Sequence, residues 1–184
     1  MSHLSGKRVL AVMTNYGVEQ DELVVPVEHL REAGAEVTVA ASELAPIRTL
    51  TGDKEPGRTT DADQALDDVD PAGYDLLLVP GGTINADTLR RQDAALSLTK
   101  AFIASGRPIA AICHGPWLLV EADAVGGKRL TSYPSLQTDV RNAGGTWVDQ
   151  EVVRDDAEGW TLITSRNPGD LPAFCDAIDA ALQE

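Results

Sequence analysis

The sequence predicts an α/β fold, a three-layer α/β/α sandwich built on a doubly wound, mostly parallel sheet of the flavodoxin-like kind. Short apolar runs alternate with longer helical patterns along the chain, and no internal repeat or linker interrupts them. The runs are apolar along their whole length, which is typical of parallel strands covered by helices on both faces. The 184 residues suffice for a sizeable core, so we expect one domain over residues 1–184.

The first part of the chain shows strand and helix patterns in alternation. An apolar run, a helical pattern ended by a glycine and a second apolar run follow one another. A polar segment rich in Asp, Thr and Gly then precedes a third run, and we expect it to mix short strands with loop. The expected elements are strands at 8–13, 36–40 and 75–79, a helix at 20–33, and the mixed segment at 42–70.

The second part of the chain continues the alternation and ends in a hairpin and a helix. Two strand patterns flank an acidic turn that closes on Gly159, which predicts a β-hairpin. Proline stands in the first turn of one expected helix, where its missing N–H costs nothing. The expected elements are a strand at 108–112, helices at 93–105, 116–122, 135–143 and 171–182, and hairpin strands at 151–154 and 160–164.

Cys113 stands at the junction of a strand and a helix, which is the most informative feature of the sequence. Such a turn is sharp and strained, and it needs small neighbours, here Ala111 and Gly115. We expect the sulfur to project toward solvent, and the helix N-terminus to stabilise the thiolate and lower the pKa of Cys113. The alternative is a buried structural cysteine.

Ligands of a parallel α/β sheet bind beyond the carboxyl ends of its strands. Three segments follow strands at that edge and should meet there: residues 14–22, Pro80-Gly81-Gly82 and the turn at Cys113. The sequence therefore places a candidate site at this edge.

The charge and composition exclude several classes of partner. The formal net charge of −14 argues against nucleic acid and against anionic membrane surfaces, since both require basic patches. No apolar run reaches the length of a membrane span, and residues 1–8 have no signal-peptide core. The two cysteines, Cys113 and Cys175, are expected to be reduced thiols in a cytoplasmic protein.

The small number of histidines excludes further activities. No histidine follows residue 114, so the His-x-Glu of a class I glutamine amidotransferase is absent. His29 has no second ligand at metal-binding spacing, and we expect it to be solvated or partly packed on its helix. No glycine-rich nucleotide motif follows a strand, so the sequence predicts neither a metal nor a cofactor.

Several motifs resemble the ThiJ/PfpI superfamily, and most closely its PfpI branch of intracellular proteases and stress proteins. The resemblance runs from about residue 7 to residue 182, and the motif around Cys113 is specific. The matching stretches are Gly17–Leu23 with Leu30–Gly34, Val79–Gly82, Ala111–Pro116, Leu130–Pro134, Arg141–Gly144, Trp147–Asp149, Glu151–Val153 and Thr164–Phe174.

The resemblance implies roles for individual residues. Cys113 matches the nucleophile, Glu22 the acidic residue that contacts its sulfur, and His114 the histidine that follows it. Asp87 is the candidate for an acidic third member supplied by an adjacent subunit, and the N–H groups of Gly82 and His114 are candidate oxyanion donors.

Each of the acidic assignments has a structural alternative. Glu22 has the properties of a solvated acid in the first helical turn, where it favours the helix dipole. Asp87 is equally suited to be a helix N-cap. Glu19 and Asp21 are expected to be solvated acids at the helix start.

Two functions remain open on the same residues. One is a cofactor-independent cysteine hydrolase or lyase of the intracellular protease, deglycase or glyoxalase type, acting on small carbonyl compounds or peptides. The other is a stress-response protein that uses Cys113 as a redox sensor. The resemblance also implies a homodimer or a hexamer. The candidate aromatic residues for an interface are Trp117, Trp147, Trp160 and Phe174, although burial in the hydrophobic core would explain their presence equally well.

Overall fold

The computed structural model describes residues 3–184, so Met1 and Ser2 of the predicted domain lie outside the described residues. Its centre is a seven-stranded sheet with the strand order β11-β12-β8-β7-β1-β3-β6. All neighbours in it are parallel except β11 and β12, which form the predicted hairpin. The strands are β1 (Arg8–Val12), β3 (Glu36–Ala41), β6 (Gln64–Ala65), β7 (Leu76–Val79), β8 (Ile109–Ile112), β11 (Val152–Asp155) and β12 (Leu162–Ser165).

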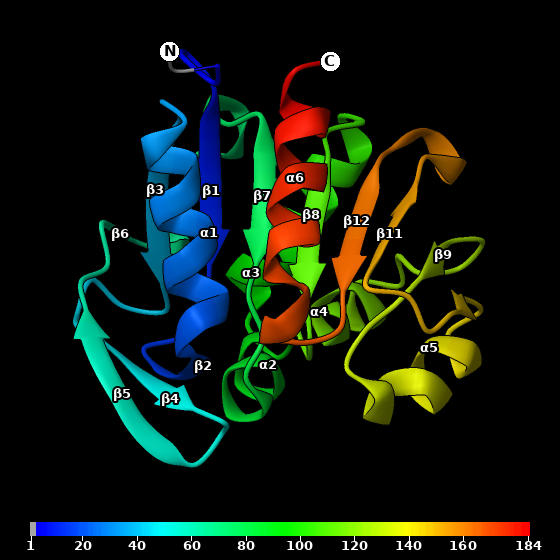
Figure 1. Cartoon of the computed structure of the whole chain (residues 1–184), viewed down its shortest axis with the longest axis horizontal. Helices are drawn as coiled ribbons and strands as arrows, with labels where there is room; N and C mark the ends of the chain where they lie inside the picture. The colour runs from blue at the N-terminus through cyan, green and yellow to red at the C-terminus, as the bar shows by residue number, and fades with distance from the viewer. Residues whose placement is uncertain (1–2) are drawn as a thin grey trace.

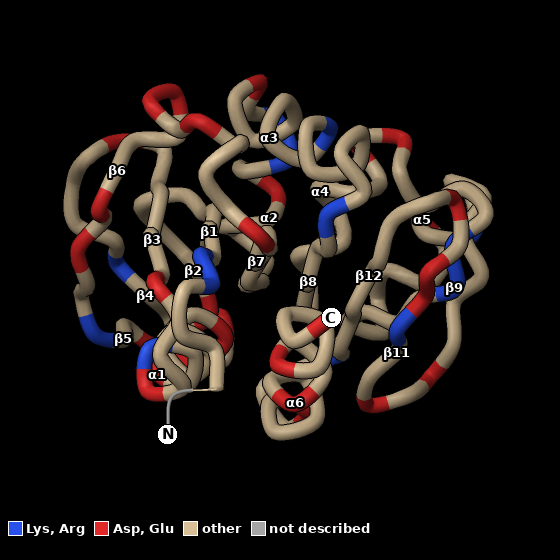
Figure 2. The backbone as a smooth tube through the Cα atoms, turned by 90° about the horizontal axis from the view of Figure 1, so that it is seen from above, with Lys and Arg blue, Asp and Glu red and all other residues tan. Residues whose placement is uncertain are grey.

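Helices cover both faces of this sheet, which confirms the predicted three-layer sandwich (Figures 1 and 2). The helices α1 (Gln20–Glu32) and α6 (Leu171–Leu182) lie on one face and pack against each other. The opposite face carries α3 (Asp93–Ala104) and α4 (Pro116–Glu121). All four helices lie within two residues of their predicted bounds.

The side chains of the central strands alternate between two hydrophobic clusters, one under each helical layer. In β7, Leu76 and Leu78 pack with α1 and α6, while Leu77 and Val79 pack with α3 and α4. The strand is therefore buried on both faces and tolerates no polar residue. The same alternation holds along β1 and β8. Of the four aromatic residues named above, Phe174 and Trp160 are buried in these clusters, whereas Trp117 and Trp147 are only half-buried.

Several elements were not predicted. The helix α2 (Thr83–Leu89) directly follows the Gly81-Gly82 turn, and the short strands β9 (Arg129–Leu130) and β10 (Thr146–Trp147) form a separate two-stranded sheet. The helix expected over 135–143 begins as a 3-10 turn and continues as α5 (Gln137–Asn142).

A second, three-stranded sheet lies outside the central one and positions part of the site. It consists of β2 (Tyr16–Glu19), β4 (Ile47–Thr51) and β5 (Glu55–Thr60), in that order. The strands β4 and β5 come from the polar segment 42–70, where short strands were expected. Their hairpin extends below the carboxyl ends of the central strands in Figure 1. The turn between them carries residues 52–54 to the edge where the site was predicted.

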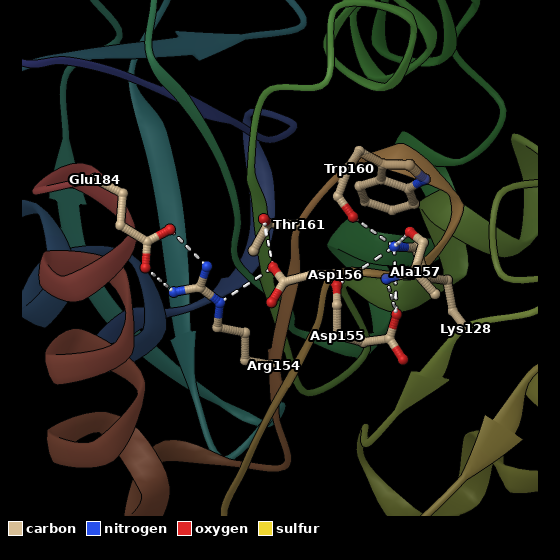
Figure 3. Close-up of polar contacts among 8 residues, drawn as sticks. All are labelled: Lys128, Arg154, Asp155, Asp156, Ala157, Trp160, Thr161 and Glu184. Atoms are coloured by element: carbon tan, nitrogen blue, oxygen red, sulfur yellow. Dashed lines mark hydrogen bonds and ion pairs between the residues drawn. The ribbon is translucent and has the colours of Figure 1, made fainter.

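Lys128 is a fully buried lysine that closes the loop between β11 and β12. Its ammonium group donates to the backbone carbonyls of Ala157 and of Trp160, the latter at 2.6 Å, and lies 3.4 Å from a carboxylate oxygen of Asp155 (Figure 3). It also stands 4.1 Å from the centre of the Trp160 ring, a cation–π contact. Burial lowers the pKa of Lys128, and the charge of Asp155 opposes that effect.

Replacing Lys128 with methionine should destabilise the protein by about 3 kcal/mol, because the buried carbonyls and Asp155 lose their partner. The free energy of unfolding, measured by urea denaturation, checks this expectation. Lys100→Met is the control, since Lys100 is exposed on α3. Equal stability of the two variants would contradict a structural role for the buried ammonium group.

Candidate active site

Cys113 occupies the strained turn that the sequence predicts. Its φ of 61° lies in the left-handed region, which non-glycine residues rarely adopt. The N–H of Cys113 donates to the carbonyl of Ser165 at 3.0 Å, and its carbonyl accepts from the N–H of Tyr133 at 2.8 Å. The turn is thereby fixed between β12 and the segment that follows β9.

Small residues surround this turn because there is no room for larger ones. A Cβ on Gly115 would lie 2.6 Å from the carbonyl oxygen of Val79, so the predicted need for a small residue there is confirmed. A Cβ on Gly81 would lie 2.5 Å from Oε2 of Glu22 and 2.8 Å from Cβ of Cys113. Glycine at position 81 thus allows the carboxyl group and the cysteine to meet.

The expected exposure of the sulfur is wrong, because Cys113 is only 5% exposed. It lines a pocket of about 160 Å³ whose walls include the β4–β5 turn and Tyr133. The other lining residues are Glu19, Glu22, Gly52, Asp53 and Pro168. The cysteine therefore faces a small, partly open pocket at the carboxyl edge of the sheet.

The expected fall in the pKa of Cys113 is also wrong. Burial raises the pKa of the thiol, and the negative charge that Glu22 carries when it is ionised raises it further. Hydrogen bonds from the N–H groups of Gly82 and His114 lower it but do not offset the burial. The free thiol form is thus favoured until a base accepts its proton.

Glu22 is fully buried, which rules out a solvated acid. Its Oε2 accepts a hydrogen bond from the N–H of Gly81 at 2.8 Å. Burial raises the pKa of Glu22 to about 8, against the side chain of Cys113 and the hydrogen bond from Gly81, which lower it. At neutral pH the carboxyl group is therefore largely protonated and lies beside the sulfur.

His114 contacts the sulfur directly. Its Nδ1 lies 3.1 Å from Sγ of Cys113, and the ring is 5% exposed. The ring stacks on Tyr133 with a centroid distance of 4.6 Å and meets the edge of Trp117 at 5.2 Å. Burial lowers the pKa of His114, which favours the neutral imidazole that can accept a proton.

Asp87 does not join these residues within its own chain. It is exposed on α2, and the structure shows it no hydrogen bond to Cys113, His114 or Glu22 among residues 3–184. The N-cap of α2 is Gly82, so the alternative function of Asp87 as an N-cap is wrong. A contribution across a subunit interface stays a prediction.

The structure adds three residues that the sequence did not single out for the site. Glu19 is buried, contrary to expectation, and its carboxylate accepts the N–H groups of Gly52 and Asp53 at 2.9 and 3.0 Å. Asp53 in turn binds Thr83, whose hydroxyl lies 3.3 Å from Nε2 of His114. Asp21 is exposed, as expected.

The other residues and features considered in the sequence lie outside this site. His29 is partly buried and contacts Asp179 of α6 at 3.0 Å, and both cysteines are free thiols. Residues 3–184 hold no group of three or more His, Cys, Asp or Glu side chains arranged to bind a metal ion. No helix in that range is both long and apolar enough to span a membrane.

Comparison with known proteins identifies the family. The model described as the DJ-1/PfpI family matches residues 7–181. General stress protein 18 of Bacillus subtilis is 41% identical over 169 residues, which cover 92% of this chain and 94% of that protein. Protein/nucleic acid deglycase 2 of Escherichia coli is 41% identical over 165 residues, or 90% and 92% of the two chains.

A solved structure agrees with the sequence matches. Drosophila melanogaster DJ-1beta has a TM-score of 0.85 and 31% identity, and the match covers 96% of this chain and 90% of that one. The chain belongs to the DJ-1/PfpI family, which confirms the resemblance and the flavodoxin-like fold. Its relatives include proteins named as deglycases and as stress proteins.

Replacing Glu22 with glutamine should remove a pH dependence of stability. The folded-state pKa of about 8 lies above the ordinary value of 4.5, so the folded state holds the proton more tightly. The associated stability is fully present below pH 4.5 and is lost as the pH rises through about 8. We expect the wild type to lose on the order of a few kcal/mol between pH 5 and 8 relative to Glu22→Gln.

Urea denaturation at several pH values measures this difference. Glu32→Gln, an exposed position on the same helix, should retain the wild-type slope. If Glu22→Gln shows that slope too, the buried carboxyl group is ionised in the folded state and this account of Glu22 fails.

Proposed function

We propose that this protein is a stress-associated, cofactor-independent cysteine enzyme of the deglycase, glyoxalase or intracellular protease type, with Cys113 as its nucleophile. The observation that carries the proposal is the 3.1 Å contact between Sγ of Cys113, which lines a pocket, and Nδ1 of the buried imidazole of His114. A thiol in hydrogen-bond contact with a neutral base is the arrangement that nucleophilic catalysis requires. The names of the relatives support the same class.

The reaction begins with a proton transfer inside this pair. His114 takes the thiol proton at Nδ1 as the sulfur forms a bond to the carbonyl carbon of the substrate, and the π electrons of the carbonyl move to its oxygen. The N–H groups of Gly82 and His114, which point at the sulfur, are the proposed donors to that oxygen. With an aldehyde, the imidazolium returns its proton to the oxygen and leaves a hemithioacetal.

With an acyl substrate, the intermediate collapses in the other direction. The carbon–nitrogen bond breaks, the leaving nitrogen takes the proton from His114, and water then hydrolyses the thioester. The proposed role of Glu22 is the same in both cases. Its protonated carboxyl group donates to the sulfur when the sulfur carries negative charge, which offsets part of the cost of a buried thiolate.

The pocket favours a small, uncharged or cationic substrate. Its volume of about 160 Å³ holds only a few heavy atoms, and the acidic residues Glu19, Glu22 and Asp53 line it. An anionic group would meet the carboxylates there without a basic partner among the lining residues. We therefore propose a small carbonyl compound, or a carbonyl group carried by a peptide, as the substrate.

A redox sensor is the second candidate, and the position of Glu22 favours it. A buried carboxylic acid beside the sulfur is suited to donate a hydrogen bond to a sulfenate or sulfinate, which would stabilise the oxidised form. The Bacillus subtilis relative is named a general stress protein, which is compatible with this role.

The proposal extends to a reduced, cytoplasmic protein that assembles as a homodimer or hexamer. In such an assembly Asp87 is the candidate that approaches the neighbouring site from α2. An activity per subunit that falls on dilution would support this contribution, and constant activity down to the monomer would exclude it.

Replacing Cys113 with alanine should abolish turnover of methylglyoxal and of a glycated peptide, because no other thiol lines the pocket. Cys175→Ala is the control, since Cys175 is a buried thiol on α6 with no contact to the pocket, and it should retain activity. Product formation by chromatography measures both.

The same variants distinguish the two proposed functions, the cysteine enzyme and the redox sensor. No turnover by the wild type, together with peroxide oxidation of Cys113 to a sulfinate detected by mass spectrometry, would favour the sensor. Turnover that persists in Cys113→Ala would exclude Cys113 as the nucleophile.

A further inference from the structure

A short chain of polar contacts leads from the far side of His114 to a carboxylate of the same subunit. Nε2 of His114 lies 3.3 Å from Oγ1 of Thr83, and Oγ1 of Thr83 lies 2.8 Å from Oδ2 of Asp53. The backbone N–H of Thr83 donates to the other oxygen, Oδ1, at 2.8 Å. Both oxygens of Asp53 are thus directed at one residue, which touches the imidazole.

The number of hydrogens fixes the direction of these bonds. A carboxylate accepts only, so the single hydroxyl hydrogen of Thr83 points toward Asp53. The hydroxyl oxygen can then only accept a hydrogen bond from the imidazole. Nε2 of His114 must therefore carry the hydrogen. A neutral imidazole protonated at Nε2 has a free lone pair at Nδ1, the atom 3.1 Å from the sulfur.

We propose that Asp53, acting through Thr83, is the positioning carboxylate that holds His114 in the Nε2-protonated form and so presents Nδ1 to Cys113 as a base. The inference rests on the proposed function and adds a role to it. It supplies the acidic third member from within the chain, whereas Asp87 would supply it from a neighbouring subunit.

The fold holds Asp53 in place for this task. Asp53 has a left-handed φ of 58° in the β4–β5 turn, and its N–H is bound by the buried carboxylate of Glu19 at 3.0 Å. Glu19 stands at the N-cap of α1, three residues before Glu22. The turn is therefore attached to the helix that also supplies the carboxyl group on the other side of the sulfur.

Among residues 3–184 of the same chain, His114 has no competing partner of equal quality. The titratable side chains against the ring are Cys113 and Tyr133, and Asp53 acts through Thr83. Trp117 is neutral, and the hydroxyl of Ser135 lies at 3.5 Å, the outer limit of a hydrogen bond. The charge of Asp53 raises the pKa of His114 against the effect of burial, so it also stabilises the imidazolium formed when the thiol loses its proton.

The protonation site of His114 tests the inference without any substrate. Protein labelled with 15N-histidine gives long-range 1H–15N spectra that separate a protonated from an unprotonated ring nitrogen, and His114→Asn assigns the signals. We expect a protonated Nε2 and an unprotonated Nδ1 in the wild type at neutral pH. A proton on Nδ1 would overturn the inference.

Two variants of Thr83 isolate the hydroxyl group. Thr83→Val keeps the size of the side chain and the N–H bound to Asp53, but it removes the hydroxyl that links Asp53 to His114. Both neutral forms of the imidazole, protonated at Nε2 or at Nδ1, should then appear. Thr83→Ser keeps the hydroxyl and should retain the wild-type spectrum. In a Cys175→Ala background, iodoacetamide should alkylate Cys113 about tenfold more slowly in Thr83→Val than in Thr83→Ser.

Asp53→Asn provides an independent variant. Asparagine tolerates the left-handed φ, and its amide donates where the carboxylate accepts, so the Thr83 hydroxyl turns toward Nε2 and the proton moves to Nδ1. Alkylation of Cys113 should slow by a similar factor, and its pH profile should change. Asp123→Asn is the matched control, because Asp123 is exposed and has a φ of 56°.

The result does not depend on whether the protein turns over a substrate. Spectra and alkylation rates that follow the Thr83 hydroxyl establish the positioning role even if no turnover is found. Spectra and rates that are equal in Thr83→Val, Asp53→Asn and wild type would exclude this role, even for an active enzyme. Should Thr83→Val fail to fold, the wild-type spectrum and Asp53→Asn still decide.

Discussion

The left-handed backbone of Cys113 is the constraint around which the site is built. This conformation costs about 1–3 kcal/mol for a residue with a side chain. It persists because both backbone polar groups of Cys113 are bound, one by the carbonyl of Ser165 and one by the N–H of Tyr133. The same bonds tie β8 to β12 and to the segment that carries Tyr133, so the orientation of the sulfur is fixed by the central sheet.

Burial determines the charge state of the groups around that sulfur. It raises the pKa values of Cys113 and Glu22 and lowers that of His114, so each change favours the neutral form. A site of neutral groups avoids the cost of separated charges in a small pocket. In the mechanism that we propose, reactivity depends on moving one proton from sulfur to nitrogen, which makes the protonation site of the imidazole decisive.

The apolar runs of the sequence predicted the central sheet well, since strands such as β7 are buried on both faces and carry no ambiguity. The turn at Cys113 was predicted for a similar local reason. The burial of Cys113 was not predicted, because the β4–β5 turn that lines the same pocket lies about sixty residues earlier in the chain. Asp53 and Thr83 were missed because they are thirty residues apart, and a Thr-Gly-Asp stretch by itself indicates only a turn. The pattern of α2 was missed since its seven residues alternate apolar and polar types without a clear helical face.

The hairpin of β4 and β5 belongs to neither layer of helices and adds no strand to the central sheet. One of its residues, Ile47, packs in the cluster under α1 and α6, but the others can vary in evolution without disturbing the hydrophobic clusters. Its tip still reaches Thr83, which contacts the imidazole. The core and the β4–β5 hairpin are therefore under different kinds of selection. Mutations in the core affect folding, whereas under the proposed role of Asp53 mutations at the tip of this hairpin change how readily the thiol reacts, so that relatives with the same scaffold can differ in chemistry.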